Sequence, residues 1–239
     1  MIKSLIFFIV WYPLRFILYF FPQEVTYKGC CFLGKVFSFV SRGHKKVMKS
    51  ELKALIKDMS EAESSRVSDT AFKHIIIDEE ERLFFDKKDR VLSIVDFKGL
   101  ENLDEALKKG HGAMMVLAHF GNHLLVIPAL GYKGYPIFQL AEQGASSGEK
   151  NQGFLQSLVI KRRRSLGAKM PAEFISANKV GKNVFKILED NKVLLCAFDG
   201  RVGKKIKEFD FIGRKMLLSS GIFRIAQSAG SPVLPLFIV

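Results

Sequence analysis

Residues 114–124 of the chain are MMVLAHFGNHL, a short apolar run that ends in His119 and is followed at once by Gly121. The run is shorter than a typical helix and fits a buried β-strand, while Gly121 and Asn122 tolerate the backbone angles of a tight turn. A histidine that a strand end delivers into a turn can act as a general base, because neutral imidazole accepts a proton near pH 7. The same residues also fit a structural histidine beside the core.

The pattern around this run predicts an α/β fold with a mostly parallel central sheet flanked by helices, because short apolar runs alternate with amphipathic segments from residue 90 onward. The expected strands are residues 91–97, 113–118, 136–140, 193–198 and 233–239. The expected helices are residues 102–109, 124–130, 151–166, 178–190 and 219–229. In such sheets ligands collect beyond the carboxyl ends of the strands, so His119 and Asp199 should face one crevice.

An apolar block, residues 5–21, precedes this region and favours contact with lipid. It is a little shorter than the ~20 residues that cross a bilayer, is broken by Pro13 and carries Arg15. A spanning helix, a kinked re-entrant hairpin, an interfacial helix and a buried core helix all stay open. No small-residue cleavage site follows the block, so we expect a retained anchor and not a secretory signal.

The domain organisation follows from these patterns. We expect an N-terminal membrane anchor and helical segment over residues 1–88, and an α/β domain over residues 89–239. Within the first, helices are expected at residues 31–40 and 44–57, and at residues 60–85 from a capping box formed by Ser60 and Glu63. The chain ends inside an apparent core strand, so its C-terminus is expected to be truncated.

The charge balance restricts the partners. There are 37 Lys and Arg residues against 24 Asp and Glu, and the formal charge of +13 favours anionic partners such as phospholipids, phosphorylated glycolipids and acidic carrier proteins. Nucleic acid is not expected, because no RNA- or DNA-binding signature is present. The cysteines Cys30, Cys31 and Cys196 show no spaced pairing pattern, which fits a reduced, cytoplasm-facing setting.

Basic residues supply two further candidate sites. Lys161 is followed by Arg162, Arg163 and Arg164, whose planar guanidinium groups suit phosphate or carboxylate, although a solvated surface patch explains the same residues. A second group, Lys204, Lys205 and Lys207, is expected in a flexible loop after Asp199.

The closing part of the chain carries two more motifs. Residues 209–214 are FDFIGR, and Ser219-Ser220-Gly221 is typical of a helix N-terminus with a serine cap.

Taken together, these motifs resemble the lipid A late acyltransferases, the lauroyl and myristoyl transferases of lipopolysaccharide synthesis, within the glycerolipid acyltransferase superfamily. The likeness covers the whole chain and is most specific at residues 119–122 and 209–214. It implies transfer of a fatty acyl group from acyl carrier protein or acyl-CoA to a hydroxyl of an anionic, lipid A precursor-like glycolipid. It also implies a location at the cytoplasmic face of the bacterial inner membrane, membrane lipids and acyl carrier protein as partners, and no cofactor.

The resemblance also implies roles for individual residues. His119 would be the catalytic base, with Asp199 as a second catalytic residue. The expected substrate-binding residues are Gly121, Asn122, His123, Arg162, Arg163, Arg164, Arg214 and Ser219. No metal is expected, because no acid completes a zinc pattern around His119 and His123.

One position departs from the family's pattern. Five residues after the histidine such enzymes normally carry Glu or Asp, which orients the imidazole, whereas this chain has Leu124. Three alternatives stay open: another acid such as Asp199 takes over, a backbone carbonyl orients His119 in a weaker enzyme, or the chain binds lipid or acyl carrier without turnover.

Overall fold

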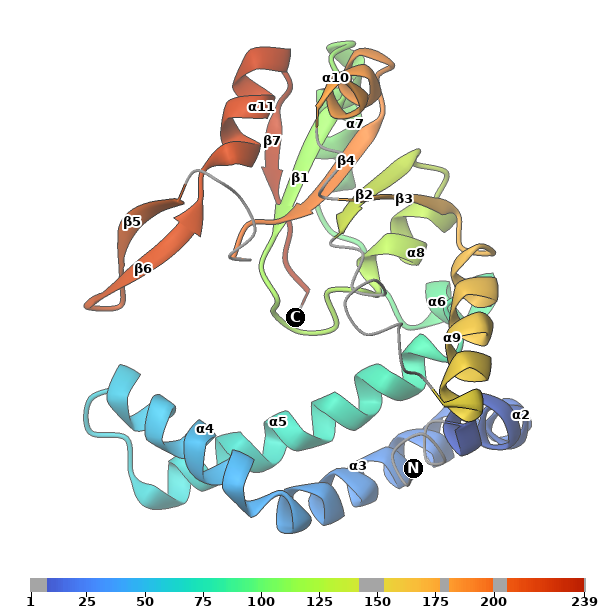
Figure 1. Cartoon of the computed structure of the whole chain (residues 1–239), viewed down its shortest axis with the longest axis vertical. Coiled ribbons are helices and arrows are strands. Elements are labelled where there is room, and N and C mark those ends of the chain that lie inside the picture. The colour runs from blue at the N-terminus through green and yellow to red at the C-terminus, as the bar shows by residue number, and fades with distance from the viewer. Residues whose placement is uncertain (1–7, 142–152, 177–180, 200–205, 239) are drawn as a thin grey trace. The chain divides into compact units, whose positions relative to one another are not determined.

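The structure, a computed structural model, describes residues 8–141, 153–176, 181–199 and 206–238. The chain forms two compact units, a helical unit, Met1–Phe84, and an α/β unit, Phe85–Val239 (Figure 1). Each unit has its own packed interior, as its amphipathic sequence requires.

Packed helices build the helical unit. They are the π-helical turn η1 (Val10–Leu14) and the helices α2 (Arg15–Tyr19), α3 (Gln23–Val40), α4 (Arg42–Leu55) and α5 (Glu61–Arg82). Helices α3 and α5 approach so closely that a Cβ atom on Gly34 would lie 2.5 Å from the Cα of Lys73. The rings of Phe37 and Phe72 meet edge to face between these helices, with centroids 5.3 Å apart.

The three helices predicted for this unit are present. Helix α5 begins as expected, because the Ser60 hydroxyl accepts a hydrogen bond from the Glu63 N–H at 3.1 Å. Helix α3 is longer than predicted and begins at Gln23, directly after Pro22, which has the extended backbone typical of a residue that precedes a helix.

The apolar N-terminal block is folded around its proline and arginine. Pro13 lies inside η1, and Arg15 begins α2. The Arg15 Nε donates a hydrogen bond to the Leu83 carbonyl at 2.6 Å, and the guanidinium lies 5.7 Å from the Phe84 ring centroid. The cation inside the apolar block is thus satisfied by the last residues of the same unit.

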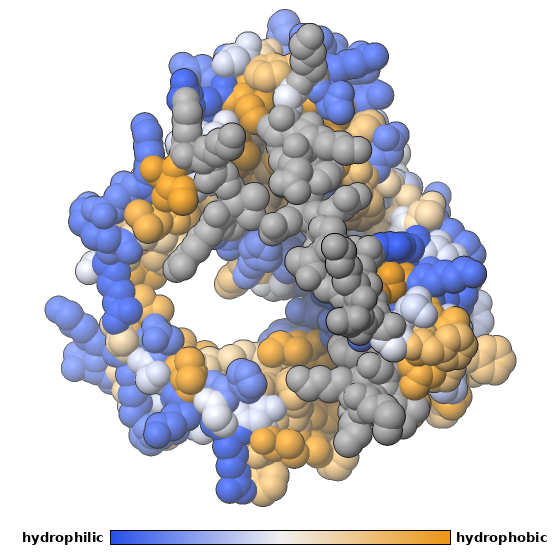
Figure 2. Space-filling view, viewed as in Figure 1, coloured by the Kyte–Doolittle hydropathy of each residue, from blue (hydrophilic) through white to orange (hydrophobic). Residues whose placement is uncertain are grey.

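The predicted membrane anchor stays a prediction. Among the described residues, none of the helices combines the length and the hydropathy that crossing a bilayer requires. Large apolar side chains are nevertheless exposed on α2 and α3, and hydrophobic residues lie over both helices on the face shown in Figure 2. They include Phe16 of α2, Phe20 directly after that helix, and Phe32, Phe39 and Val40 of α3, each 66–73% exposed.

A sheet of five parallel strands forms the centre of the α/β unit, which confirms the predicted fold class. Its strands are β1 (Ala113–Leu117), β2 (Ile137–Ala141), β3 (Ala172–Ser176), β4 (Val193–Ala197) and β7 (Val233–Pro235), in the order β3-β2-β4-β1-β7. Strands β1 and β4 pair in parallel from Ala113 opposite Val193 to Leu117 opposite Ala197. Both are buried on two faces, so their sequences are continuously apolar.

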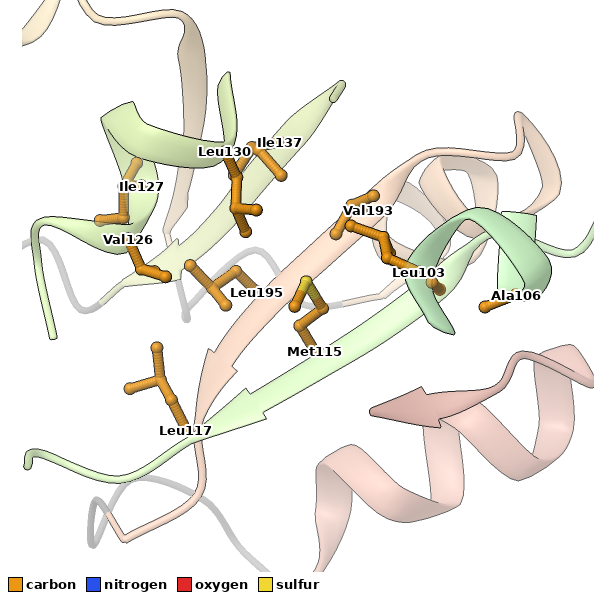
Figure 3. Packing of buried hydrophobic residues seen from close by; sticks show 11 residues of the cluster. Leu103, Ala106, Met115, Leu117, Val126, Ile127, Leu130, Ile137, Val193 and Leu195 are labelled. Atoms are coloured by element: carbon orange, nitrogen blue, oxygen red, sulfur yellow. The ribbon is translucent and has the colours of Figure 1, made fainter. Parts of the chain in front are cut away.

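Helices cover both faces of the sheet. Met115, Leu117 and Leu195 point to the face covered by α7 (Leu100–Lys108) and α8 (Val126–Tyr132), as Figure 3 shows. The alternate residues of the same strands, such as Val116 and Cys196, point to the opposite face. There they pack against α10 (Lys182–Glu189) and α11 (Gly221–Ala229).

The connections out of the two central strands run to opposite faces. The chain leaves β1 through α8 to reach β2, and it leaves β4 to reach β7 through α11. Because α8 and α11 cover different faces, the carboxyl ends of β1 and β4 are where the connections part, and such a point forms a ligand crevice in parallel sheets.

The strand predicted at residues 91–97 is wrong, because this segment begins within helix α6 (Lys88–Ser93) and continues without regular structure. Val91 is buried against Phe85, Leu125 and Ala129 in a small cluster of its own. A short apolar run fits a buried helix turn as well as a strand. In this segment the packing against α8 favours the helix.

Three strands were not predicted. Strand β3 pairs in parallel with β2 although its sequence, AEFIS, has little strand signal. Strands β5 (Ile206–Phe211) and β6 (Arg214–Ser219) form an antiparallel hairpin, with positive φ angles of 50° and 70° at Ile212 and Gly213. Such angles allow a two-residue hairpin turn.

The remaining boundaries shift by a few residues. Lys207, expected in a loop, is part of β5, and Lys204 and Lys205 lie outside the described residues. Helix α8 begins at Val126 instead of residue 124, and β7 ends at Pro235 instead of residue 239. Helix α9 (Phe154–Gly167) begins after its N-cap Gly153, and residues 151 and 152 of the predicted helix 151–166 lie outside the described residues.

Candidate active site

The pairing of β1 with β4 brings His119 and Asp199 together. Each residue of β1 lies opposite the β4 residue whose number is higher by 80, as Leu117 lies opposite Ala197. His119 and Asp199 continue this register two residues beyond the strand ends. The ladder extends toward them, because the Phe198 N–H donates to the Leu117 carbonyl at 3.0 Å. Both residues therefore lie together just beyond the carboxyl ends of two paired parallel strands, as predicted.

Two hydrogen bonds join His119 to Asp199. The His119 backbone N–H donates to Asp199 Oδ2 at 2.8 Å, and the ring Nδ1 lies 2.7 Å from Oδ1. The His119 side chain is 54% exposed and that of Asp199 is 20% exposed. The carboxylate thus lies beneath an imidazole that is open to solvent, and both of its oxygens bind the same residue.

The glycine turn after His119 lies close to the backbone of Ile238. Gly121 has a φ of +58°, which favours glycine, and a Cβ there would lie 2.8 Å from the carbonyl oxygen of Ile238. The segment leading to Ile238 continues the sheet, since the Leu236 N–H donates to the Val116 carbonyl at 2.8 Å. Gly121 is therefore required both by its backbone angle and by a close backbone neighbour.

Asn122 and His123 lie in the turns between β1 and α8. Asn122 is buried, with 9% exposure. The His123 ring meets the His119 ring edge to face, with centroids 4.6 Å apart. His123 is thus beside the candidate base although the two histidines share no helix.

Leu124 packs inward instead of orienting the histidine. It is partly buried and lies against two clusters of core residues, one that includes Leu117 and one that includes Leu125. The acid on His119 comes from another strand, as the first of the three alternatives predicted.

The other predicted site residues are not joined to this pair. Arg162, Arg163 and Arg164 lie on α9, Arg214 begins β6 opposite Phe211, and Ser219 ends β6 with 9% exposure. None of the hydrogen bonds and ion pairs that His119 and Asp199 make within the described ranges reaches an arginine or Ser219. Ser220 is the N-cap of α11, but its side chain makes no capping bond, unlike the serine cap predicted.

The pair has the chemistry of an oriented base. Burial raises the pKa of the Asp199 carboxyl, but the hydrogen bonds from His119 outweigh burial, so that this pKa is below its ordinary value. An ionised Asp199 accepts the Nδ1–H of the ring, which leaves the lone pair on Nε2. That nitrogen can remove a proton from a hydroxyl, and Asp199 can stabilise the imidazolium that results.

Metal ligation has no support from the side chains whose positions are described. His119 contacts both His123 and Asp199, yet over the described ranges no three His, Cys, Asp or Glu side chains are arranged to hold a metal ion.

Ile238 is a site residue that sequence reasoning missed. It lies far along the chain from Gly121, and its contribution is a backbone carbonyl, so no residue type marks it. The only available signal was the apolar run 233–239, which predicted a strand beside the crevice but not a contact with the turn.

Gly121→Ala should destabilise the protein by about 1–3 kcal/mol more than Gly110→Ala. Both glycines have positive φ, but a Cβ on Gly110 meets nothing within 4 Å, so this variant measures the backbone strain alone. Denaturant unfolding of the two variants measures the difference. Equal losses would mean that the Ile238 carbonyl does not constrain the turn.

The Asp199 carboxyl should titrate below an ordinary aspartate, and His119→Ala should raise its pKa by removing the side-chain hydrogen bond. Because the folded pKa is depressed, the stabilisation exists above the unfolded pKa of Asp and is lost as the pH falls through the folded value. The ¹³C shift of the carboxyl followed by NMR measures both values. An unchanged pKa in His119→Ala would contradict the hydrogen bond.

Comparison with known proteins agrees with this chemistry. The chain matches the family model described as bacterial lipid A biosynthesis acyltransferase over residues 1–239. No curated protein matches it. Because the match covers the whole chain, the chain belongs to the bacterial lipid A biosynthesis acyltransferase family.

Proposed function

We propose that the chain transfers a fatty acyl group from the thioester of acyl carrier protein or coenzyme A to a hydroxyl of an anionic glycolipid that resembles a lipid A precursor. The family supports acyl transfer. The observation that carries the proposal is the 2.7 Å contact between His119 Nδ1 and Asp199 Oδ1, because it leaves Nε2 as the basic nitrogen of an exposed ring.

In this mechanism His119 Nε2 removes the proton of the acceptor hydroxyl as its oxygen attacks the thioester carbonyl carbon. A new C–O bond forms, and the tetrahedral intermediate then collapses with cleavage of the C–S bond. The imidazolium returns its proton to the sulfur, so that the products are an ester and a free thiol. Asp199 holds the ring in one tautomer throughout and stabilises its charged form.

Positive charge supports an anionic acceptor and an acidic carrier. Arg163 and Arg164 are exposed on α9, where guanidinium groups can bind phosphate in a bidentate manner. Arg214 is exposed at the start of β6 and presents a third guanidinium. We assign Arg162 and Ser219 to the same substrate surface on the strength of the family resemblance.

A lipid substrate also requires access to a membrane. The exposed apolar side chains of α2 and α3 support association of the helical unit with a lipid surface. We place the protein at the cytoplasmic face of the bacterial inner membrane, where thioester donors and reduced cysteines are both available.

The silent-homologue alternative has no observation in its favour. That alternative arises from the lack of an acid at position 124. Asp199 supplies the carboxylate that contacts His119, whereas Leu124 packs against the core.

His119→Ala should abolish acyl transfer, and Asp199→Asn should reduce its rate by about 10²–10⁴-fold, because the amide stabilises neither the productive tautomer nor the imidazolium. The measurement is transfer from radiolabelled acyl carrier protein to a lipid A precursor. His111→Ala is the control, since its side chain is exposed and lies before β1. Activity retained in His119→Ala would refute the proposed base.

Leu124→Glu should not raise the transfer rate and should lower stability by about 1–3 kcal/mol, because it places a carboxyl against packed apolar side chains while Asp199 already orients His119. Leu124→Gln controls for size without charge. Turnover and thermal unfolding are measured together. A clear gain in turnover for Leu124→Glu would show that Asp199 does not serve as the orienting acid.

A further inference from the structure

A basic cavity lies within the helical unit, between α3, α4 and α5. Its volume is about 690 Å³, within the range of small-molecule sites. Four cations line it, Lys35 from α3, Lys45 from α4, and Arg66 and Lys73 from α5, together with one acid, Asp69. None of the residues assigned above to the transfer reaction belongs to it.

The single acid is already engaged. Asp69 Oδ1 accepts hydrogen bonds from Lys45 Nζ at 2.5 Å and from the Ser38 hydroxyl. Burial raises the pKa of Asp69, but Lys45, Ser38 and Lys73 together hold it below its ordinary value, so the carboxylate stays ionised and fixes Lys45 in place.

The other cations lack a matching acid. In the part of the chain that the structure describes, the side chains of Lys35 and Arg66 make no hydrogen bond or ion pair. With one acid among four cations, the cavity has a net charge of +3. A concave surface of one sign concentrates anions of the opposite sign.

The remaining lining suits phosphate. Ser65 and Thr70 add hydroxyl donors beside Arg66, and guanidinium and ammonium groups with hydroxyls are the usual partners of phosphate oxygens. Ligands of this kind range from inorganic phosphate to a phospholipid headgroup.

The surroundings of the cavity distinguish among these anions. Phe39 lines the cavity and is 68% exposed, and Phe32 and Val36, two turns and one turn before it on α3, are 66% and 43% exposed. The spacing places all three on one side of α3. A phosphate in the cavity would therefore lie at the end of an apolar row, which matches the junction of headgroup and acyl chain in a lipid.

We propose that this cavity binds the phosphorylated headgroup of an anionic lipid, with the lipid's acyl chain along Phe32, Val36 and Phe39. The site is separate from the transfer chemistry and would hold the helical unit on anionic membrane regions. An acidic protein surface is the competing ligand, but a concave cavity bordered by exposed phenylalanine side chains favours a lipid.

The test compares two double variants of the full chain that remove the same charge. Lys35→Gln with Arg66→Gln alters the cavity, while Lys28→Gln with Lys46→Gln removes two exposed cations of α3 and α4 that do not line it. Binding is measured by flotation with phosphatidylcholine vesicles, with or without phosphatidylglycerol. Acyl transfer to an acceptor dissolved in detergent confirms that both variants retain a working active site.

The cavity variant should lose roughly 30-fold in affinity for the anionic vesicles, and the control variant no more than about threefold. Lys35→Arg with Arg66→Lys, which keeps the charges, should bind almost normally. Equal losses in the two double variants would overturn the proposal in favour of general surface charge.

Two further ligands complete the test. Inorganic phosphate and glycerol 3-phosphate are titrated against the wild type and the cavity variant, and weak binding that only the wild type shows would support the headgroup site. If the cavity variant loses these anions, or loses acyl carrier protein, but keeps its vesicle affinity, then the cavity serves a soluble anion or an acidic protein and the proposal is wrong.

Discussion

The parallel pairing of β1 with β4 is the constraint on which the site depends. It places two continuously buried strands at the centre of the sheet, and its register continues past their ends into the contact between His119 and Asp199. A slip of one residue would exchange the side chains that face the two core clusters, so the packing of the core and the geometry of the base are fixed together. The packing of these strands therefore fixes the relative positions of His119 and Asp199.

The sequence was informative wherever local pattern coincided with burial. The central strands, the flanking helices and the capped start of α5 were predictable, because apolar periodicity and the Ser60 cap record them directly. His119 was predictable as a strand-end histidine before a glycine, and Asp199 as a strand-end acid that could orient it. Which acid reaches the ring depends on strand order, and no local residue pattern contains that information.

The errors have the same physical origin. Residues 91–97 were apolar enough for a strand, but contacts from α8 and Phe85 decide their structure. Every residue of β5 is exposed, so the hairpin lacks the buried face by which strands are usually recognised. The helix expected from residue 124 starts at Val126, after a glycine turn that lies against the distant Ile238 carbonyl. Leu124 suggested a defect from its identity alone, whereas its packing gives it a role in the core.

The strand order also has a consequence for biosynthesis. Strand β1 is the first of the sheet to leave the ribosome, yet its two neighbours, β4 and β7, are translated last among the five. Until β4 and β7 are synthesised, β1 is an apolar segment of the nascent chain with unpaired backbone groups on both edges. Such a segment is prone to aggregation. Assembly of the sheet edge that carries His119 and Asp199 is thus a late event in synthesis, and holdase chaperones would protect the chain until then.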